Sequence, residues 1–112
     1  MAVKLKFLGD TIQVTINNSR IEGQNFIFQA LVEDSNLPKN IENLIFDMDK
    51  VEYVNSLGIA EFISIHRYFA SVTNSKTRIR FINVNQKIAN LFRLIELGNL
   101  SEIELKTPVK GA

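Results

Sequence analysis

Apolar and polar residues alternate along the first part of the chain. Val3, Leu5 and Phe7 are separated by lysines, and a second alternating stretch over residues 12–16 follows a turn signal at residues 9–10. A period of two places successive side chains on opposite faces of a β-strand. The pattern therefore predicts a half-buried hairpin of two strands.

Further along, helical periods and short apolar runs replace this alternation. A run over residues 44–46 predicts a central strand covered on both faces. Ser56 has a good N-cap side chain and precedes apolar residues at helical spacing. The elements predicted after the hairpin are a helix over Gln24–Asp34, a strand over Leu44–Phe46, a helix that begins after Ser56 and ends near Asn74, a strand over Ile79–Ile82, a helix over Gln86–Leu97 closed by Gly98, and a last strand over Ile103–Leu105. This order predicts an α/β fold, a mixed β-sheet of four to five strands with three to four helices packed on it.

Composition narrows the class of function. The 112 residues suffice for one domain but not for two, so we expect a single domain over residues 1–112. A formal net charge of +1 gives no field that would attract nucleic acid or a membrane surface. Cysteine is absent and His66 is the one histidine, which excludes thiol chemistry and a histidine-rich metal site. The N-terminus has no apolar run long enough for a signal sequence or membrane span. We expect a cytoplasmic protein whose partners are proteins.

The segment Leu44–Gly58 is the most informative, and two hypotheses explain it. In the first, Asp47 and Asp49 after an apolar strand look like the first motif of haloacid dehalogenase-type phosphatases. The first aspartate would attack phosphorus, and the second would act as general acid and base beside magnesium. The rest of such a site is missing, because residues 83–86 after the later strand include no carboxylate and Lys50 stands where that family usually has glycine. The phosphatase is therefore the weaker hypothesis.

In the second hypothesis, Asp47 ends a strand and the tetrapeptide at residues 55–58, Asn-Ser-Leu-Gly, opens a helix. This segment resembles the STAS domains of anti-sigma factor antagonists, in which a strand ending in aspartate precedes an Asp-Ser-x-Gly segment. The resemblance extends through residues 59–62, 79–84 and 88–98, and covers roughly residues 41 to 104. The family usually has aspartate before the serine, whereas this chain has Asn55.

The resemblance implies a regulatory function. The unphosphorylated protein would bind an anti-sigma factor that is itself a serine kinase, and would thereby free a sigma factor. The kinase would phosphorylate Ser56, and a phosphoserine phosphatase would reset the switch. ATP and magnesium would belong to the kinase, so this chain would be no enzyme and would need no cofactor, metal or catalytic residue. The residues expected at the partner-binding edge are Asp47, Asp49, Glu52, Asn55, Ser56, Leu57, Gly58 and Glu61.

A phosphate at Ser56 is expected to act on the surface and not on the core. It would add about 1.5 to 2 negative charges at the positive end of a helix. Free amides at a helix start tolerate an anion, so the fold would persist while a partner packed around Ser56 would be displaced. Asn55 keeps the hydrogen-bonding shape of aspartate without its charge, which eases repulsion of a phosphate but departs from the residue usual in the kinase's target.

Simpler explanations exist for the same residues. Ser56 could be only a helix N-cap worth about 1 kcal/mol. Gly58 could be a flexible turn residue, or it could allow the close approach of another backbone. Asp47, Asp49 and Glu52 could be solvated charges at the end of a strand. The chain could also be a constitutive STAS scaffold subunit in a larger sensory or lipid-transport complex.

Overall fold

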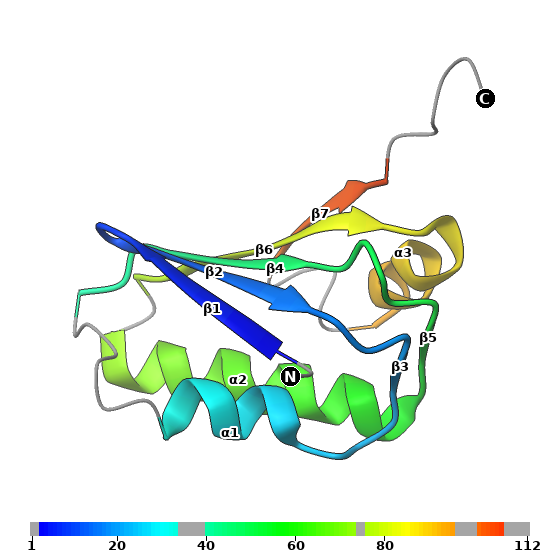
Figure 1. Cartoon of the computed structure of the whole chain (residues 1–112), viewed down its shortest axis with the longest axis horizontal. Coiled ribbons are helices and arrows are strands. Elements are labelled where there is room, and N and C mark those ends of the chain that lie inside the picture. Colours follow the sequence, from blue (N-terminus) through cyan, green and yellow to red (C-terminus); the bar gives the residue numbers. More distant parts are fainter. Residues whose placement is uncertain (1–2, 34–39, 74–75, 96–100, 107–112) are drawn as a thin grey trace.

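The computed structural model describes residues 3–33, 40–73, 76–95 and 101–106 of the chain (Figure 1). Its elements are β1 (Val3–Leu8), β2 (Thr11–Ile16), β3 (Arg20–Ile21), α1 (Phe26–Val32), β4 (Asn43–Asp47), β5 (Tyr53–Val54), α2 (Ser56–Thr73), β6 (Arg78–Val84), α3 (Gln86–Arg93) and β7 (Glu102–Leu105). A five-stranded sheet has the order β1-β2-β4-β6-β7, and β3 pairs with β5 in a separate small sheet. β1 runs antiparallel to β2, and the other neighbours in the large sheet are parallel. The predicted α/β class and mixed sheet are confirmed.

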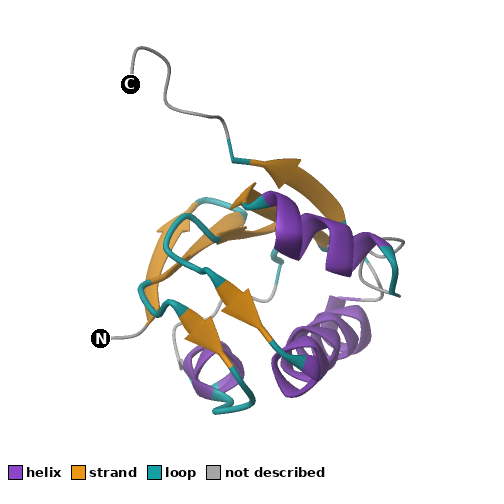
Figure 2. Cartoon of the chain, turned by 90° about the vertical axis from the view of Figure 1, so that its right-hand side faces the viewer, coloured by secondary structure: helices purple, strands orange, loops and turns teal. Residues whose placement is uncertain are grey.

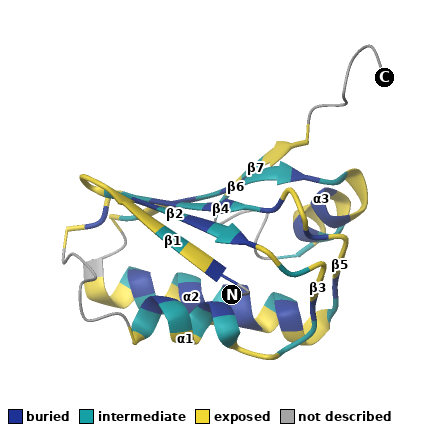
Figure 3. Cartoon of the chain, in the orientation of Figure 1, coloured by how far each residue is buried: buried dark blue, intermediate teal, exposed yellow. Residues whose placement is uncertain are grey.

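The three helices of the described residues lie on one side of the large sheet (Figures 1 and 2). Phe46 of β4 and Phe81 of β6 stack with their ring centroids 5.1 Å apart. Phe62 of α2 and Phe92 of α3 each meet Phe81 at a steep angle, with centroids 5.1 and 5.0 Å away. Such aromatic contacts add to the free energy gained by burying the rings. The core therefore lies between the sheet and the helices (Figure 3).

Alternation along the strands leaves the second face of the sheet partly exposed. In β2, Ile12 and Val14 are buried, and Gln13 between them is half-buried. β4 alternates in the same way, because Leu44 and Phe46 are buried whereas Ile45 is half-buried. The expectation that this strand is covered on both faces is wrong, since none of the described helices lies over the second face (Figure 2).

Helix α1 is shorter than its apolar spacing predicted. Asn25 adopts a left-handed conformation with φ 61°, so the helix begins after it and not at Gln24. α2 runs to Thr73, close to the predicted end. α3 ends at Arg93, and residues 97–98, which were expected to close it, lie outside the described residues, as do Asp34 and Asn74. No helix within the described ranges is long and apolar enough to cross a membrane.

The small sheet of β3 and β5 was not predicted. Each strand has two residues, which is too short for a period of two to be visible in the sequence. The strands pair in parallel, with Arg20 opposite Tyr53 and Ile21 opposite Val54. Ile21 and Val54 are buried, so this sheet is anchored to the core. It leads directly into the first turn of α2 (Figure 1).

Candidate functional site

The first turn of α2 is held by the residue that precedes it. The side-chain Oδ1 of Asn55 accepts a hydrogen bond from the backbone N–H of Gly58 at 2.9 Å. Asn55 is therefore the N-cap, and the prediction that Ser56 fills this position is wrong by one residue. Ser56 is the first residue of the helix and is exposed. Its hydroxyl forms no hydrogen bond with the other described residues.

Gly58 allows two backbones to approach each other within this chain. A Cβ atom on Gly58 would lie 2.3 Å from the carbonyl oxygen of Ile21 in β3, which is far inside van der Waals contact. The same carbonyl oxygen accepts a hydrogen bond from the backbone N–H of Asn55 at 3.1 Å. Gly58 is buried, so its expected place in a partner-binding surface is corrected: it fixes α2 against β3.

Two large apolar side chains are exposed next to Ser56. Leu57 is 62% exposed and Tyr53, at the start of β5, is 41% exposed. The guanidinium of Arg20 lies over the Tyr53 ring, 4.3 Å from its centroid. We call Arg20, Tyr53, Ser56 and Leu57 the Ser56 corner. Only Ser56 and Leu57 had been predicted, because the cross-strand pairing that places Arg20 on Tyr53 is not readable from the sequence.

Arg20 also forms an ion pair at the edge of this corner. Its Nε donates to Oε1 of Glu22 at 3.0 Å, and its second guanidinium nitrogen donates to Oε2 at 3.3 Å. The hydrogen bond from Arg20 lowers the pKa of Glu22, and the hydrogen bond to Glu22 raises the pKa of Arg20. Both side chains remain charged near neutral pH, and the fork-like contact fixes the guanidinium over Tyr53.

Asp47 and Asp49 lie together in the loop after β4 and hold that loop in place. Oδ1 of Asp47 accepts hydrogen bonds from the backbone N–H of Asp49 at 3.1 Å and from the side-chain amide of Asn83 at 3.0 Å. Asp49 forms an ion pair with Lys106 at 3.0 Å. Glu52 is exposed before β5. The observed bonds of the two aspartates thus reach the ends of β6 and β7, not the Ser56 corner.

The loop does not have the arrangement that a phosphatase of the haloacid dehalogenase type requires. One oxygen of Asp47, the expected nucleophile, is already held by two donors, and the residue that reaches it from the end of β6 is an amide, Asn83. Among the residues that the structure describes, no three His, Cys, Asp or Glu side chains are placed to hold a metal ion. The geometry gives Asp47 the role of a turn residue that accepts a bond from the amide two residues later.

Glu61 departs from its predicted place at the partner-binding edge. It is 2% exposed, and its Oε2 accepts hydrogen bonds from the backbone N–H groups of Ile27 at 2.8 Å and Phe28 at 3.0 Å. These donors belong to the first turn of α1, where Asn25 provides no side-chain cap. Glu61 therefore joins α2 to α1, and the prediction that it contacts a partner is corrected because the side chain is buried.

No protein-family model matches the chain, and no curated protein matches its sequence. Solved structures match its fold. A Thermotoga maritima protein assigned as an anti-sigma factor antagonist is 18% identical, with a TM-score of 0.66 over 91% of this chain and 85% of that one. The anti-sigma factor antagonist SpoIIAA in its unphosphorylated form is 11% identical, with a TM-score of 0.65 over 96% of this chain and 90% of that one. Its phosphorylated form, from Bacillus, is 13% identical, with a TM-score of 0.63 over 91% of this chain and 90% of that one.

The same fold occurs inside a much larger protein. The murine solute carrier 26 family member A9, an anion transporter, is 14% identical and has a TM-score of 0.69 over 91% of this chain but only 17% of its own. The chain therefore has the STAS fold, which these structures share. It covers 85% and 90% of the two anti-sigma factor antagonist structures, against 17% of the transporter.

Proposed function

We propose that this chain is a cytoplasmic anti-sigma factor antagonist that works by a phosphorylation-dependent partner switch. Its unphosphorylated form binds an anti-sigma factor serine kinase and so releases a sigma factor for transcription. The kinase phosphorylates Ser56 and the complex separates, and a phosphoserine phosphatase restores the binding form. The chain itself is a substrate without catalytic residues, and ATP and magnesium are supplied by the kinase. The fold shared with SpoIIAA in both of its forms supports this proposal.

The observation that carries the proposal is the exposure of Ser56 beside an exposed apolar residue on the first turn of a long helix. Ser56 has no structural hydrogen bond among the described residues, and Leu57 is 62% exposed. Exposed leucine and tyrosine side chains are typical of a protein-binding surface when they lie together. A modification at Ser56 would place charge within the surface that a partner has to cover.

The first turn of α2 is suited to accept a phosphate without unfolding. The backbone N–H of Gly58 is bonded to the Asn55 side chain, and that of Ile59 to the Asn55 carbonyl oxygen at 2.9 Å. The N–H groups of Ser56 and Leu57 have no partner in the described part of the chain and can face an anion. Asn55 is neutral, so it adds no repulsion. The phosphate would then be stable on the helix and unfavourable to an apolar partner.

The residues proposed to contact the kinase are those with exposed side chains around Ser56. Glu52, Ser56 and Leu57 stay in this surface, and Tyr53 and Arg20 are added to it. Asp49 is exposed, but its ion pair with Lys106 directs it to the end of β7 and not to this surface. Asp47 and Asn55 are half-buried and act by holding the loop and the helix start.

The test compares baits that differ at one position. Wild-type protein, Ser56→Ala, Ser56→Asp and the matched control Ser64→Asp, an exposed serine further along α2, are each used to capture proteins from lysate of the native host. Captured proteins are identified by mass spectrometry, and ATP is then added to the retained complexes to locate any new phosphate. We expect a serine kinase that is retained by wild type, Ser56→Ala and Ser64→Asp and lost with Ser56→Asp, and that phosphorylates wild type at Ser56.

Two results would contradict the switch. A kinase retained equally by all four baits would show that charge at Ser56 does not control binding. Identical partners on all baits without any kinase would support the alternative of a constitutive scaffold, which the occurrence of this fold within a larger transporter makes the natural second candidate.

A further inference from the structure

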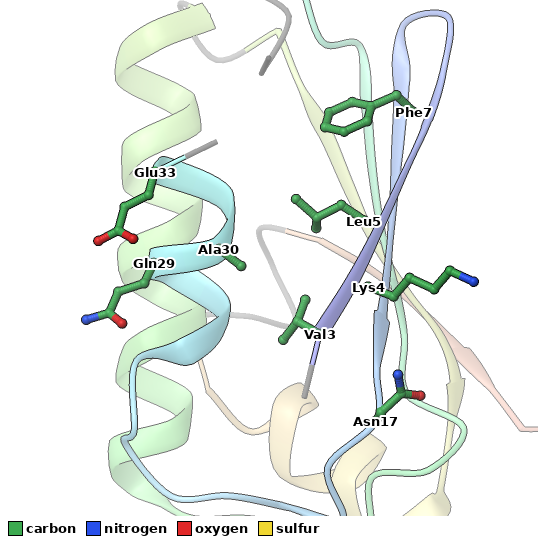
Figure 4. A pocket seen from close by; sticks show the side chains of 8 residues that line it. All are labelled: Val3, Lys4, Leu5, Phe7, Asn17, Gln29, Ala30 and Glu33. Carbon is green, nitrogen blue, oxygen red and sulfur yellow. The ribbon is translucent and has the colours of Figure 1, made fainter. Parts of the chain in front are cut away.

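A groove of about 750 Å³ lies between β1 and α1, far along the sheet from the last strand β7 (Figure 4). Val3, Leu5 and Phe7 point from β1 toward α1, and Ala30 points back from the helix (Figure 4). β1 is the first strand in the order of the sheet, so no described strand pairs with its outer edge. An extended segment placed along this edge would gain main-chain hydrogen bonds and would cover the apolar groove.

The charged side chains on the other face of β1 determine which charge such a segment should carry. Lys4 and Lys6 are exposed, and the side chain of Lys4, which is at the rim of the groove, extends away from α1 (Figure 4). Neither lysine forms an ion pair with another described residue. A second β1 placed against this edge would bring lysines opposite lysines, which is unfavourable. The occupant that fits has apolar side chains on the face toward α1 and acidic side chains on the other face.

The strand at the opposite edge of the same sheet has this pattern. β7 reads Glu102-Ile103-Glu104-Leu105. The register partners of Ile103 and Leu105 on β6 are both buried, so these two apolar side chains face the helices. Glu102 and Glu104 are exposed on the outer face. β7 is the last strand of the sheet, so within the described ranges nothing pairs with its outer edge.

The two glutamates remain accessible although they already have partners. Glu102 pairs with Arg78, and Glu104 pairs with Arg80 at 3.0 Å. Their side chains are still 55% and 64% exposed. A carboxylate has two oxygens and can accept from several donors, so a lysine from another molecule can join each pair. The arginines also hold the glutamates in place on the outer face.

We propose that β7 of one copy adds to the free edge of β1 of the next copy, so that the sheets of successive copies become continuous. Lys4 and Lys6 then meet Glu102 and Glu104 on the outer face. Leu105, which is 39% exposed, covers the groove beside α1, while Ile103 stays packed against the core of its own copy. Within one copy, β7 runs parallel to β2, and β1 runs antiparallel to both. When two copies have the same orientation, β7 of one copy and β1 of the next therefore pair antiparallel. Because the contact joins two different surfaces, it is head-to-tail and builds chains or rings.

Sedimentation velocity over a range of protein and salt concentrations tests this proposal without reference to a kinase. We expect wild type to associate as its concentration rises, and the association to weaken as salt screens the charges. Lys4→Glu with Lys6→Glu, and separately Glu102→Lys with Glu104→Lys, should each raise the dissociation constant about tenfold or more, because two cross-strand attractions become repulsions. An equimolar mixture of the two double variants should associate again, because each reversed edge then meets an edge of opposite charge.

Folding and the identity of the occupant are checked separately. Circular dichroism verifies that each variant is folded, and Glu102→Gln with Glu104→Gln, which adds no repulsion toward the arginines, replaces the lysine variant if that one is unfolded. A peptide of residues 101–106, added to isotope-labelled wild type, should shift the backbone amide signals of residues 3–8. The proposal is overturned if the wild-type protein stays monomeric at low salt and high concentration. It is also overturned if neither charge reversal changes the dissociation constant of the association. Peptide binding without self-association would also overturn it and would assign the groove to a strand of another protein.

Discussion

Helices α1 and α2 contact each other on the same side of the sheet, yet their first turns are held in different ways. α2 is capped by its immediate neighbour Asn55. α1 follows Asn25, whose left-handed backbone leaves its side chain without a capping bond, and its first amides are held by Glu61 from α2. The start of α2 is therefore determined locally, whereas the start of α1 depends on tertiary structure.

This difference agrees with the proposed function, in which the start of α2 is modified and the contact between α1 and α2 stays unchanged. The hydroxyl of Ser56 can gain or lose a phosphate while the cap of α2, which belongs to Asn55, stays intact. Glu61 lies further along the same helix and is buried, so the link between the helices is shielded from that change. The signal is thus expected to stay at the surface, and loss of the tertiary cap of α1 should destabilise the fold more than loss of the local cap of α2.

The largest effect is expected from Glu61→Ala. The substitution leaves the amides of Ile27 and Phe28 buried without an acceptor, and should lower the free energy of unfolding by about 2 to 3 kcal/mol. Urea denaturation measures the loss, and hydrogen exchange should show reduced protection of these two amides. Unchanged stability together with unchanged protection would mean that Glu61 does not hold α1.

Glu61→Gln is the matched control for this substitution. It keeps an acceptor for the two amides but removes the charge, so its effect should be smaller than that of alanine. Oε1 of Glu61 is buried without a hydrogen-bond partner, so the alternative orientation of the glutamine amide gains nothing from the site. A glutamine variant as unstable as the alanine variant would assign the effect to charge and not to capping.

A smaller effect is expected from Asn55→Ala. Loss of the bond to the Gly58 amide should cost about 1 kcal/mol, as for other N-caps, and Asn55→Asp should retain the cap. Asn85→Ala is a useful comparison, since Asn85 caps α3 by accepting from the Ile88 amide at 2.8 Å. Thermal and urea denaturation measure both. An Asn55→Ala variant as stable as wild type would show that the contact of β3 with Gly58 alone sets the start of α2.

Much of the fold could be predicted from the sequence, because β2, β4 and the first part of β6 bury alternate residues, and such alternation is visible in a single sequence. The position of the cap was missed by one residue, since asparagine and serine are both good N-caps and only the backbone shows which one precedes the helix. β3 and β5 were missed because pairing, not periodicity, defines strands of two residues.

The burial of Glu61 was missed although the sequence contained a signal. Gly58, Glu61 and Ile65 are spaced as residues on one face of a helix, and all three are buried. A single acidic residue within an apolar stripe indicates a buried carboxylate that needs donors. What the spacing could not reveal is the source of those donors, the first turn of α1, because that contact spans distant parts of the chain.

The smallest effect on stability is expected at Ser56 itself. Ser56→Ala should change the free energy of unfolding by no more than about 0.5 kcal/mol, because the hydroxyl bonds to none of the described residues. Ser56→Asp should be neutral or stabilising by about 0.3 to 1 kcal/mol, because its charge lies at the positive end of α2. Ser64→Asp, exposed within the helix, lacks this interaction and should be slightly destabilising. Urea denaturation of the three variants distinguishes the cases. A decrease of about 1 kcal/mol in the free energy of unfolding for Ser56→Ala would show that Ser56 is the N-cap. Phosphorylation would then have to disturb the helix as well as the surface.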